Sequence, residues 1–366
     1  MKALYVHVPF CVKKCLYCDF NSYADTSLES QYIDALVKEI GTINEERLKT
    51  IFIGGGTPTI LSYKNLDRLL KALEGFMTEE FSIESNPGTI DEDKLQIMRK
   101  HGVNRLSMGL QAWQDSLLKK LGRIHTLNDF LESYRMARNA GFDNINIDLM
   151  FDIPGQTLEN WQETIDKVAE LKPEHISCYS LIVEEGTPFY GMWEKGELRL
   201  PDEDADRQMY YYAVERLKKY GYRQYEISNF SKPGLECRHN IVYWRDQEYA
   251  GVGAGAHGYI NGCRYSNFKG VGEYISGIRN CSAVEEKNII SMKESMEEFV
   301  FLGLRMIEGI SKKDFQKRFN IPIEEAYGRQ LKKFTSLYLL YDDGEMVKLT
   351  SRGIDVSDRI FEEFML

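Results

Sequence analysis

Six short apolar runs alternate with amphipathic stretches along the first 230 residues. The runs are Leu4–Val8, Thr50–Ile53, Phe81–Ser85, Arg105–Leu110, Asn144–Met150 and Ile176–Val183. They are rich in Ile, Val and Leu without strict polar alternation, which is typical of parallel strands buried on both faces. Between the runs, apolar residues recur at helical spacing, as at Leu66, Leu69 and Leu73. Strands separated by helices predict βαβ units and a parallel sheet.

The number of repeats bears on the fold class. Six strand–helix repeats are two fewer than a closed βα barrel needs, and a doubly wound open sheet is the competing architecture. The motifs described below favour a partial, open βα barrel of about six repeats over residues 1–230. Residues 231–290 carry Gly, Asn, Tyr and short broken apolar runs. We therefore expect a connecting region there that is rich in loops and poor in regular structure.

A new pattern begins at residue 291. Amphipathic segments predict three helices, at Met296–Ile307, Ser311–Phe319 with Ser311 as the N-cap, and Ile323–Leu337. Two apolar runs then flank Asp343-Gly344, which is a hairpin signal, and a last helix is expected over Ser351–Phe364. Three helices and a hairpin resemble a winged-helix domain. We predict a C-terminal winged-helix-like α+β domain over residues 291–366.

The charge of the chain argues against nucleic acid as a partner. There are 46 Lys and Arg against 56 Asp and Glu, a net charge of −10. Binding to a phosphate backbone depends on clustered Lys and Arg. Residues 291–366 carry 12 basic and 14 acidic side chains. We therefore interpret the winged-helix-like domain as a structural or partner-docking unit.

Localisation signals and cysteine usage indicate a reducing compartment. No apolar stretch approaches the ~20 residues of a membrane-spanning helix, and the first 11 residues lack the pattern of a signal peptide. Of the seven cysteines, three lie within eight positions. Without a secretory signal, clustered cysteines bind metal more often than they form disulfides. We expect a cytoplasmic protein with no integral membrane segment.

The strongest chemical signal is the spacing of Cys11, Cys15 and Cys18. Three thiolates can bind one soft metal site, and a fourth would close a zinc or iron–sulfur site. On a [4Fe–4S] cluster, three thiolates leave one iron free for another ligand. The alternatives are three unrelated cysteines or a zinc site with a distant fourth ligand, although no second Cys-x-x-Cys pair exists to form a zinc knuckle.

A glycine-rich segment, Gly54-Gly55-Gly56-Thr57-Pro58, directly follows the second apolar run. Consecutive glycines let the backbone approach a ligand closely and offer free N–H groups. The alternative is a tight turn between strand and helix. No GxGxxG pattern with an acidic partner supports a dinucleotide site here.

Polar residues occupy similar places in the later runs. Glu84 ends the third run and Gln111 follows the fourth, and Asp148 lies inside the fifth. Functional residues of βα barrels gather at the carboxyl ends of the strands. Asp148 within an apolar strand is costly unless a partner satisfies it, and a hydrogen bond to a neighbouring loop is the plain alternative. Arg123 is positioned to meet a carboxylate, or is a surface arginine.

The cysteine spacing directly after the first predicted strand resembles the radical S-adenosylmethionine superfamily. This implies that the free iron chelates S-adenosylmethionine and that cluster reduction yields a 5′-deoxyadenosyl radical. From residue 3 to near the C-terminus, the sequence is similar to a narrower family, the oxygen-independent coproporphyrinogen III oxidases and their relatives. The resemblance implies a cofactor site lined by Tyr5, Tyr17, Gly56, Thr57, Pro58, Glu84, Gln111, Arg123 and Asp148.

Two features depart from the oxidases. Their pattern has one more cysteine two residues after the third, where this chain has Phe20, and an extension before the first strand, which is missing here. Instead, the segment HNIVYW at His239–Trp244 resembles the HNxxYW motif of the HemW-type haem chaperones. Neutral imidazole is a good axial ligand of haem iron, and Tyr and Trp offer broad apolar faces. The alternative is a loop whose His and aromatic residues pack against the barrel.

Taken together, the resemblance implies a haem chaperone with a [4Fe–4S] cluster and S-adenosylmethionine. Haem would bind at His239, Asn240, Tyr243 and Trp244, and would pass to an acceptor haem protein such as a respiratory one. A second interpretation is a radical enzyme that decarboxylates coproporphyrinogen III or acts on another tetrapyrrole. A third is an acidic adaptor whose C-terminal domain docks a respiratory partner. The sequence is compatible with both an enzyme and a chaperone, and no catalytic residue is assigned.

Overall fold

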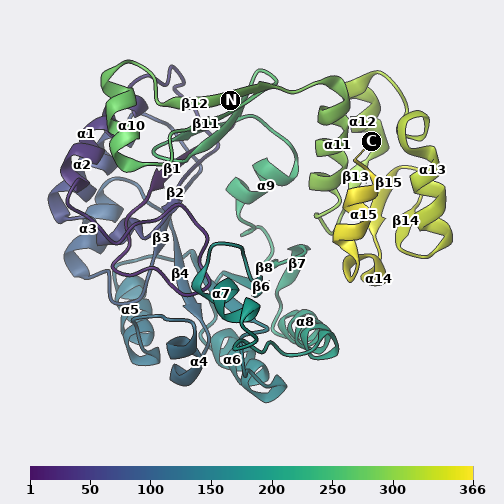
Figure 1. The fold of residues 1–366 in the computed structure, drawn as a ribbon, viewed down its shortest axis with the longest axis horizontal. Helices are drawn as coiled ribbons and strands as arrows, with labels where there is room; N and C mark the ends of the chain where they lie inside the picture. Colours follow the sequence, from purple (N-terminus) through teal and green to yellow (C-terminus); the bar gives the residue numbers. More distant parts are fainter. Residues whose placement is uncertain (366) are drawn as a thin grey trace.

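Six parallel strands form the centre of the fold in the computed structural model, which describes residues 1–365 (Figure 1). They are β1 (Ala3–Val8), β2 (Thr50–Gly55), β3 (Glu80–Ser85), β4 (Arg105–Gln111), β5 (Ile145–Phe151) and β6 (His175–Ser180). Each strand pairs in parallel with the next along the chain. The sheet does not close on itself, because other strands continue it beyond β1 and β6. The predicted open βα barrel of six repeats is confirmed.

Helices connect the parallel strands and cover the outer face of the sheet (Figure 1). They are α1 (Glu29–Ile40), the short 3-10 helix Pro58–Ile60, α2 (Tyr63–Leu73), α3 (Glu92–Lys100), α4 (Asp115–Lys120), α5 (Leu127–Asn139) and α6 (Leu158–Glu170). Two further helices, α7 (Pro188–Glu194) and α8 (Glu203–Lys219), follow the last parallel strand. Side chains define several helix starts. Thr126 and Thr157 form capping boxes with Asp129 and Asn160, which satisfy the first unpaired N–H groups of α5 and α6.

The expectation of a loop-rich stretch over residues 231–290 is wrong, because this stretch is largely regular. It follows the antiparallel strands β7 (Arg223–Glu226) and β8 (Asn229–Ser231), and contains α9 (Arg238–Trp244), β9 (Tyr249–Val252), β10 (His257–Ile260), β11 (Cys263–Asn267), α10 (Val271–Arg279) and β12 (Val284–Ile289). β9 pairs in parallel with β1, and β10 to β12 extend the same sheet. The apolar runs are broken because these edge strands are short and β12 is exposed along most of its length.

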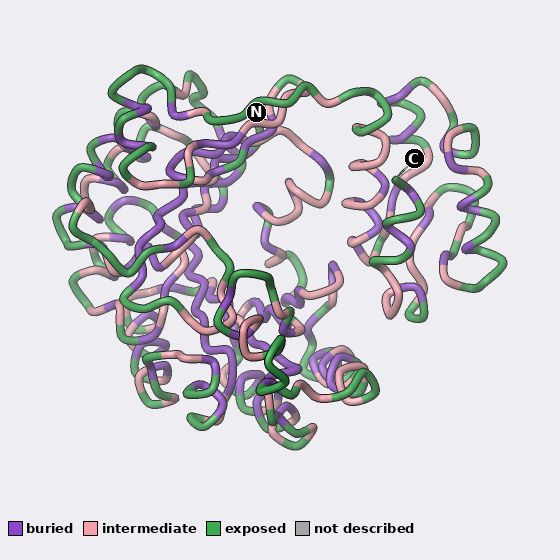
Figure 2. Tube along the Cα trace, in the orientation of Figure 1, coloured by how far each residue is buried: buried purple, intermediate pink, exposed green. Residues whose placement is uncertain are grey.

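The parallel strands do alternate, contrary to the expectation from sequence. One set of side chains, such as Leu4 and Val6 of β1, packs under the helices in the main hydrophobic core. The other set points into the open barrel and is largely polar, as with Glu84 and Arg105. Most residues of these strands are buried (Figure 2), but the inward-facing Tyr5, Glu84 and Asp148 are only partly buried. The open barrel therefore has an apolar shell and a polar interior.

The last part of the chain forms the predicted C-terminal domain with its own hydrophobic core (Figure 1). Its elements are α11 (Met292–Gly303), β13 (Ile310–Ser311), α12 (Lys312–Phe319), α13 (Ile323–Ser336), β14 (Leu340–Asp342), β15 (Met346–Leu349), α14 (Ser351–Ile354) and α15 (Ser357–Glu363). Ser311 caps α12 by accepting the N–H of Asp314, and β14 and β15 form the predicted hairpin. The expected last helix is divided into α14 and α15. The boundaries assigned to the three domains remain predictions.

Backbone and ionic contacts join the C-terminal domain to the barrel. The N–H of Ile227 donates to the carbonyl of Arg305 at 3.2 Å, and that of Ile307 donates to Tyr225 at 3.0 Å. Arg318 of α12 forms an ion pair with Asp246, just after α9, at 2.7 Å. These contacts hold the C-terminal domain next to the end of α9.

None of the helices within residues 1–365 has the length and apolar character needed to cross a membrane. The longest of them, α8, has 17 residues and is charged along its sequence. A spanning helix needs about 20 predominantly apolar residues.

Candidate functional site

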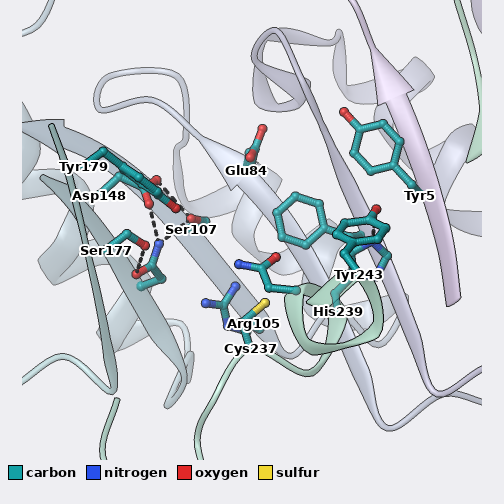
Figure 3. Close-up of a pocket in the computed structure, with 13 residues that line it drawn as sticks. Tyr5, Glu84, Arg105, Ser107, Asp148, Ser177, Tyr179, Cys237, His239 and Tyr243 are labelled. Atoms are coloured by element: carbon teal, nitrogen blue, oxygen red, sulfur yellow. Dashed lines mark hydrogen bonds between the residues drawn. The ribbon is translucent and has the colours of Figure 1, made fainter. Parts of the chain in front are cut away.

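The inner face of the open barrel encloses a cavity of about 160 Å³ (Figure 3). Inward-facing side chains of the parallel strands form its walls together with α9: Tyr5, Phe52, Glu84, Arg105, Ser107, Asn146, Asp148, Ser177, Tyr179, Cys237, His239, Asn240 and Tyr243. Three residues assigned to the S-adenosylmethionine site and three of the haem motif thus line one space. We call this space the interior cavity.

Asp148, on β5, is held by a polar network between neighbouring strands. Ser107 donates to its Oδ2 at 3.1 Å, and the amide nitrogen of Asn146 donates to its Oδ1 at 2.7 Å. Burial raises the pKa of Asp148, and these hydrogen bonds oppose the rise. A carboxylate offers about four acceptor sites, so capacity remains toward the cavity. The residue is suited to accept hydrogen bonds from hydroxyl groups of a ligand.

Glu84, on β3, is fixed by the glycine-rich segment. Its Oε2 accepts the N–H of Gly55 at 3.1 Å. Burial, and then the nearby carboxylate of Asp148, raise the pKa of Glu84 to about 8. Near neutral pH this carboxyl group is largely protonated and can donate a hydrogen bond into the cavity. Burial also raises the pKa of Tyr5, which lines the opposite wall.

The glycine-rich segment packs against the chain that enters the cysteine loop. The N–H of Gly56 donates to the carbonyl of Val8 at 2.9 Å, and that of Thr57 donates to Phe10 at 2.7 Å. A Cβ on Gly56 would lie 2.5 Å from the carbonyl oxygen of Phe10, so only glycine fits. The expectation of free N–H groups is therefore wrong for these residues. The segment instead positions Cys11, whose Sγ lies 3.6 Å from the Thr57 hydroxyl.

The three cysteines of the motif lie together in the loop between β1 and α1. Cys11 is buried, and Cys15 and Cys18 are half-buried; none is in a disulfide. Burial is the main cause that raises the pKa of Cys11 and Cys18, and the neighbouring thiols add to the rise. The Arg123 guanidinium donates to Sγ of Cys15 at 3.6 Å. The loop thus gathers three thiols beside one buried cation.

Arg123 and Gln111 meet above Gly109 at the carboxyl end of β4. Arg123 donates to Asn86 Oδ1 at 2.5 Å and to the Gly109 carbonyl at 2.6 Å. Gln111 lies in a bulge with φ of 72°, a backbone conformation that costs a non-glycine residue about 1 kcal/mol or more. A Cβ on Gly109 would lie within 3.1 Å of atoms from Gln111, Arg123 and Asn86. The missing Cβ lets these three polar side chains pack directly on the backbone of Gly109.

The residues of the cysteine loop fit a [4Fe–4S] cluster. Within residues 1–365, no three Cys, His, Asp or Glu side chains meet closely enough to hold a single ion. A four-iron cluster is larger and takes one thiolate on each of three irons, so the thiols only need to surround it. The three free thiols meet that requirement, whereas a closed zinc site needs a fourth ligand.

The neighbouring cleft is lined by polar groups, and its free volume of about 10 Å³ admits only a small polar group of a ligand. Cys15, Thr57, Asn86, Arg123 and His125 line it. Nε of Arg123 is buried without a hydrogen-bond partner within residues 1–365. Buried polar groups are normally paired, so a bound molecule with acceptor groups would complete this cleft. Tyr17 interacts with Arg123 from the other side.

The haem motif forms α9, a helix that lies against the interior of the barrel, instead of the expected loop (Figure 1). Glu80, the first residue of β3, anchors its N-terminus. The carboxylate accepts the N–H of Arg238 at 2.9 Å and the N–H of His239 at 3.1 Å, and Cys237 donates from Sγ at 3.6 Å. A carboxylate at this position satisfies N–H groups that a helix leaves unpaired.

Both ring nitrogens of His239 are engaged. Nδ1 lies 2.8 Å from the hydroxyl of Thr50, and Nε2 lies 2.7 Å from the hydroxyl of Tyr243. The ring stacks on Phe52 with centroids 5.1 Å apart. Burial, and then the positive charge of Arg105, lower the pKa of His239 to about 3. The imidazole is therefore neutral, as an iron ligand must be, but the Nε2 contact has to break before that nitrogen can bind a metal.

The other motif residues divide between two cavities. Asn240 and Tyr243 line the interior cavity with His239, whereas Trp244 does not. Trp244 borders a larger cavity of about 1010 Å³ between the barrel and the C-terminal domain. Asn240 and Tyr179 line both spaces. The motif therefore lies at the junction of the interior cavity and this interdomain cavity.

Several cavity residues were missed in the sequence. They are Phe52, Arg105, Ser107, Asn146, Ser177, Tyr179 and Cys237. Most occupy every second position of a parallel strand, in register with Tyr5, Glu84 and Asp148. The alternation of polar and apolar residues along the strands is the sequence pattern that predicts them.

Comparisons with protein families match both parts of the chain. Residues 5–168 match the family model of the radical SAM superfamily, and residues 290–356 match the HemN C-terminal domain. Proteins named Heme chaperone HemW are 41% identical to the chain in Lactococcus lactis, covering 99% of this chain and 97% of that protein, and 41% identical in Bacillus subtilis, covering 100% and 99%.

A solved structure has the same architecture over its whole length. The Escherichia coli coproporphyrinogen III oxidase (HemN), described as a radical SAM enzyme, superposes with a TM-score of 0.84 at 25% identity. The alignment covers 99% of this chain and 90% of that protein. The likeness thus includes the open barrel, the segment with α9 and the C-terminal domain.

Proposed function

The chain belongs to the HemW family of haem chaperones within the radical SAM superfamily, and we propose that it binds haem and transfers it to acceptor haem proteins in the cytoplasm. The observation that carries this proposal is the HNIVYW segment, His239–Trp244, on a helix that lies between the polar interior cavity and the interdomain cavity. Similarity to proteins named haem chaperones over nearly the full length supports it.

We propose that His239 is the axial ligand of haem iron through Nε2. The ring is neutral, and its Nδ1 contact with Thr50 would keep its orientation while Nε2 binds iron. The Tyr243 hydroxyl now lies on Nε2 and would rotate away when haem enters. Trp244 borders the larger cavity, and its indole N–H is buried without a partner within residues 1–365. That cavity is at the upper end of the ~300–1,000 Å³ usual for small-molecule sites.

We further propose that Cys11, Cys15 and Cys18 hold a [4Fe–4S] cluster and that S-adenosylmethionine binds beside it. The bound cluster would supply an electron to the sulfonium of S-adenosylmethionine. The protein's part is positioning. Arg123, Gln111 and Thr57 would bind the polar end of the cofactor, and Asp148 would accept hydrogen bonds from its hydroxyl groups. Tyr5, Tyr17, Gly56, Pro58 and Glu84 complete the proposed contact set.

A haem titration tests the proposed function. Anaerobically reconstituted wild-type protein and His239→Ala would be titrated with haem while the Soret band is recorded. Saturable binding near one haem per chain, with a weaker or shifted band in His239→Ala, is the expected result. Transfer would then be followed as a change in the Soret band when an apo-haem protein is added. No specific binding by the wild type would overturn the proposal.

The oxidase activity remains a second candidate because of the structural match to HemN at 25% identity over 99% of the chain. Phe20, at the place of the fourth cysteine of that family, is 64% exposed and has no thiol to offer. Every residue proposed to contact S-adenosylmethionine is present. An anaerobic assay for protoporphyrinogen from coproporphyrinogen III distinguishes the two. Product formation would favour the enzyme, and its absence together with haem transfer would favour the chaperone.

A further inference from the structure

Arg105 is a fully buried cation without a bonding partner. It is the first residue of β4, is only 2% exposed, and is among the largest fully buried side chains. Within residues 1–365, no hydrogen bond or ion pair engages its guanidinium, and Nε is buried and unpaired. A buried charge without a partner costs several kcal/mol. The fold tolerates this cost at a site that lines the interior cavity (Figure 3).

The acidic groups nearest to Arg105 are already engaged by other partners. The carboxyl groups whose charges act on it are those of Glu80 and Asp148, whereas the nearby thiol of Cys237 and phenol of Tyr225 are neutral because burial raises the pKa of each. Both oxygens of Glu80 accept N–H groups of α9. Both oxygens of Asp148 accept from Ser107 and Asn146. These acids balance the charge of Arg105 at a distance, but they leave its five N–H donors free for a ligand.

Arg105 is also the only Lys or Arg among the residues that line the interior cavity. A guanidinium presents two parallel N–H groups that match a carboxylate. The cavity of about 160 Å³ accepts such a group but lies below the ~300 Å³ at which sites for whole small molecules begin. The geometry therefore suits the acidic end of a larger ligand whose body extends beyond this cavity.

The interdomain cavity of about 1010 Å³ gives room for that body, which would extend from His239 in the interior cavity past Asn240 into the interdomain cavity. It shares Tyr179 and Asn240 with the interior cavity. Seven acidic and three arginine side chains line it, so a carboxylate is repelled there and attracted toward Arg105. Within residues 1–365, no Lys lines either cavity. An acidic side arm would thus pass between Tyr179 and Asn240 to reach the guanidinium.

We propose that Arg105 binds one propionate carboxylate of haem at the floor of the interior cavity. This inference rests on the proposed function, and adds the residue that recognises the acidic side chain of the tetrapyrrole. Arg105 lies at the amino end of β4, whereas Gln111 lies at the carboxyl end of the same strand, about 20 Å away at ~3.3 Å per residue. The methionine carboxylate of a cofactor bound beside Gln111 and Arg123 is therefore a different group.

The test compares haem with its dimethyl ester, in which both propionates are neutral. Wild-type protein should bind haem about ten- to a hundred-fold more tightly than the ester. This difference in affinity corresponds to the loss of a pair of charge-assisted hydrogen bonds. Arg105→Gln should bind the two equally, and Arg105→Lys should retain part of the preference. Arg68→Gln, at an exposed ion pair with Asp34 on the outer face, serves as the matched control and should behave as the wild type.

Each outcome separates this inference from the proposed function. Equal binding of haem and ester by the wild type, or an unchanged preference in Arg105→Gln, overturns the role of Arg105 while haem binding itself stands. No haem binding by any variant overturns the proposed function instead. If Arg105→Gln still prefers haem over the ester but no longer binds S-adenosylmethionine, Arg105 binds the carboxylate of that cofactor. This result would also overturn the inference. If Arg105→Gln does not fold, the wild-type preference and Arg105→Lys still decide.

Discussion

The hydroxyl of Thr50, the first residue of β2, lies 2.8 Å from Nδ1 of His239, the second residue of α9. The two residues are 189 positions apart. The contact fixes the ring plane of His239 and leaves only Nε2 to exchange partners. Nε2 lies 2.7 Å from the hydroxyl of Tyr243, so the proposed binding of haem iron would compete with one hydrogen bond inside the protein.

Tyr243→Phe should therefore strengthen haem binding. The substitution removes the hydroxyl on Nε2 and keeps the ring, so the cost of breaking that bond, about 1 kcal/mol, no longer opposes ligation. An increase in affinity of roughly fivefold is expected in a Soret titration. Tyr220→Phe, at the exposed end of α8, is the control. Markedly weaker binding by Tyr243→Phe would mean that its hydroxyl contacts haem directly.

Serine at Cys11, Cys15 or Cys18 should abolish the iron–sulfur cluster. Each thiolate would bind one iron, and a hydroxyl is a poor ligand for it. After anaerobic reconstitution, iron and sulfide per chain should fall from about four to near zero in each variant. Cys281→Ser, at an exposed cysteine after α10, should retain the full content. Full content in any of the three motif variants would remove that cysteine from the ligand set.

Gln111→Gly should weaken cofactor binding without lowering the stability of the fold. Gln111 has φ of 72° at the bulge of β4, so glycine relieves about 1 kcal/mol of backbone strain. The free energy of unfolding in urea should stay the same or rise, while binding of S-adenosylmethionine in equilibrium dialysis should weaken. Asn320→Gly, at φ of 60° after α12, should stabilise without affecting the cofactor. Unchanged cofactor binding in Gln111→Gly would contradict the assigned role.

Asp152 should make the protein less stable as the pH rises. Burial, and then the nearby charge of Asp206, raise its pKa to about 7. The unfolded chain loses this proton near pH 3.8, whereas the folded protein keeps it to about pH 7. Stability is therefore lost as the pH rises through that window. Solvent in the adjoining cavity reduces the effect to about 1–2 kcal/mol.

Urea unfolding of wild type and Asp152→Asn at pH 5 and pH 8 measures this effect. Asparagine cannot ionise and tolerates the positive φ of 63° at this position. The variant should lose the decline seen in the wild type between the two pH values. Asp204→Asn, at an exposed position of α8, is the control and should keep it. The same decline in Asp152→Asn would assign the pH dependence to other groups.

The sequence predicts the open barrel because local signals are strong there. Apolar runs and intervening amphipathic stretches indicate strands and helices directly, and a capping serine such as Ser311 marks a helix start. The candidate cofactor residues are predicted at strand ends because parallel strands bring those ends together. Accordingly, Arg123 contacts Cys15 of the cysteine loop, and it lies together with Gln111 beside Gly109.

The remaining features depend on contacts between distant residues. Tyr5 and Phe52 point into the barrel but are largely apolar. The sequences of β1 and β2 therefore do not show a clear alternation of polar and apolar residues. The edge strands β9 to β12 are short, and β9 is defined by pairing with β1 rather than by its own pattern. α9 has seven residues, too few to be stable alone, and depends on Glu80 and Thr50. No local signal in the sequence encodes these partners.

The position of β1 sets an order of events during synthesis. Among the strands of this sheet it is the earliest in the chain, yet it lies between β2 and β9, and its pairing with Tyr249–Val252 must wait until those residues are made. Until then one edge of β1 has unpaired N–H and C=O groups, which can pair with another nascent chain. A protein proposed to carry haem therefore itself needs protection from aggregation until residues 249–252 have been made.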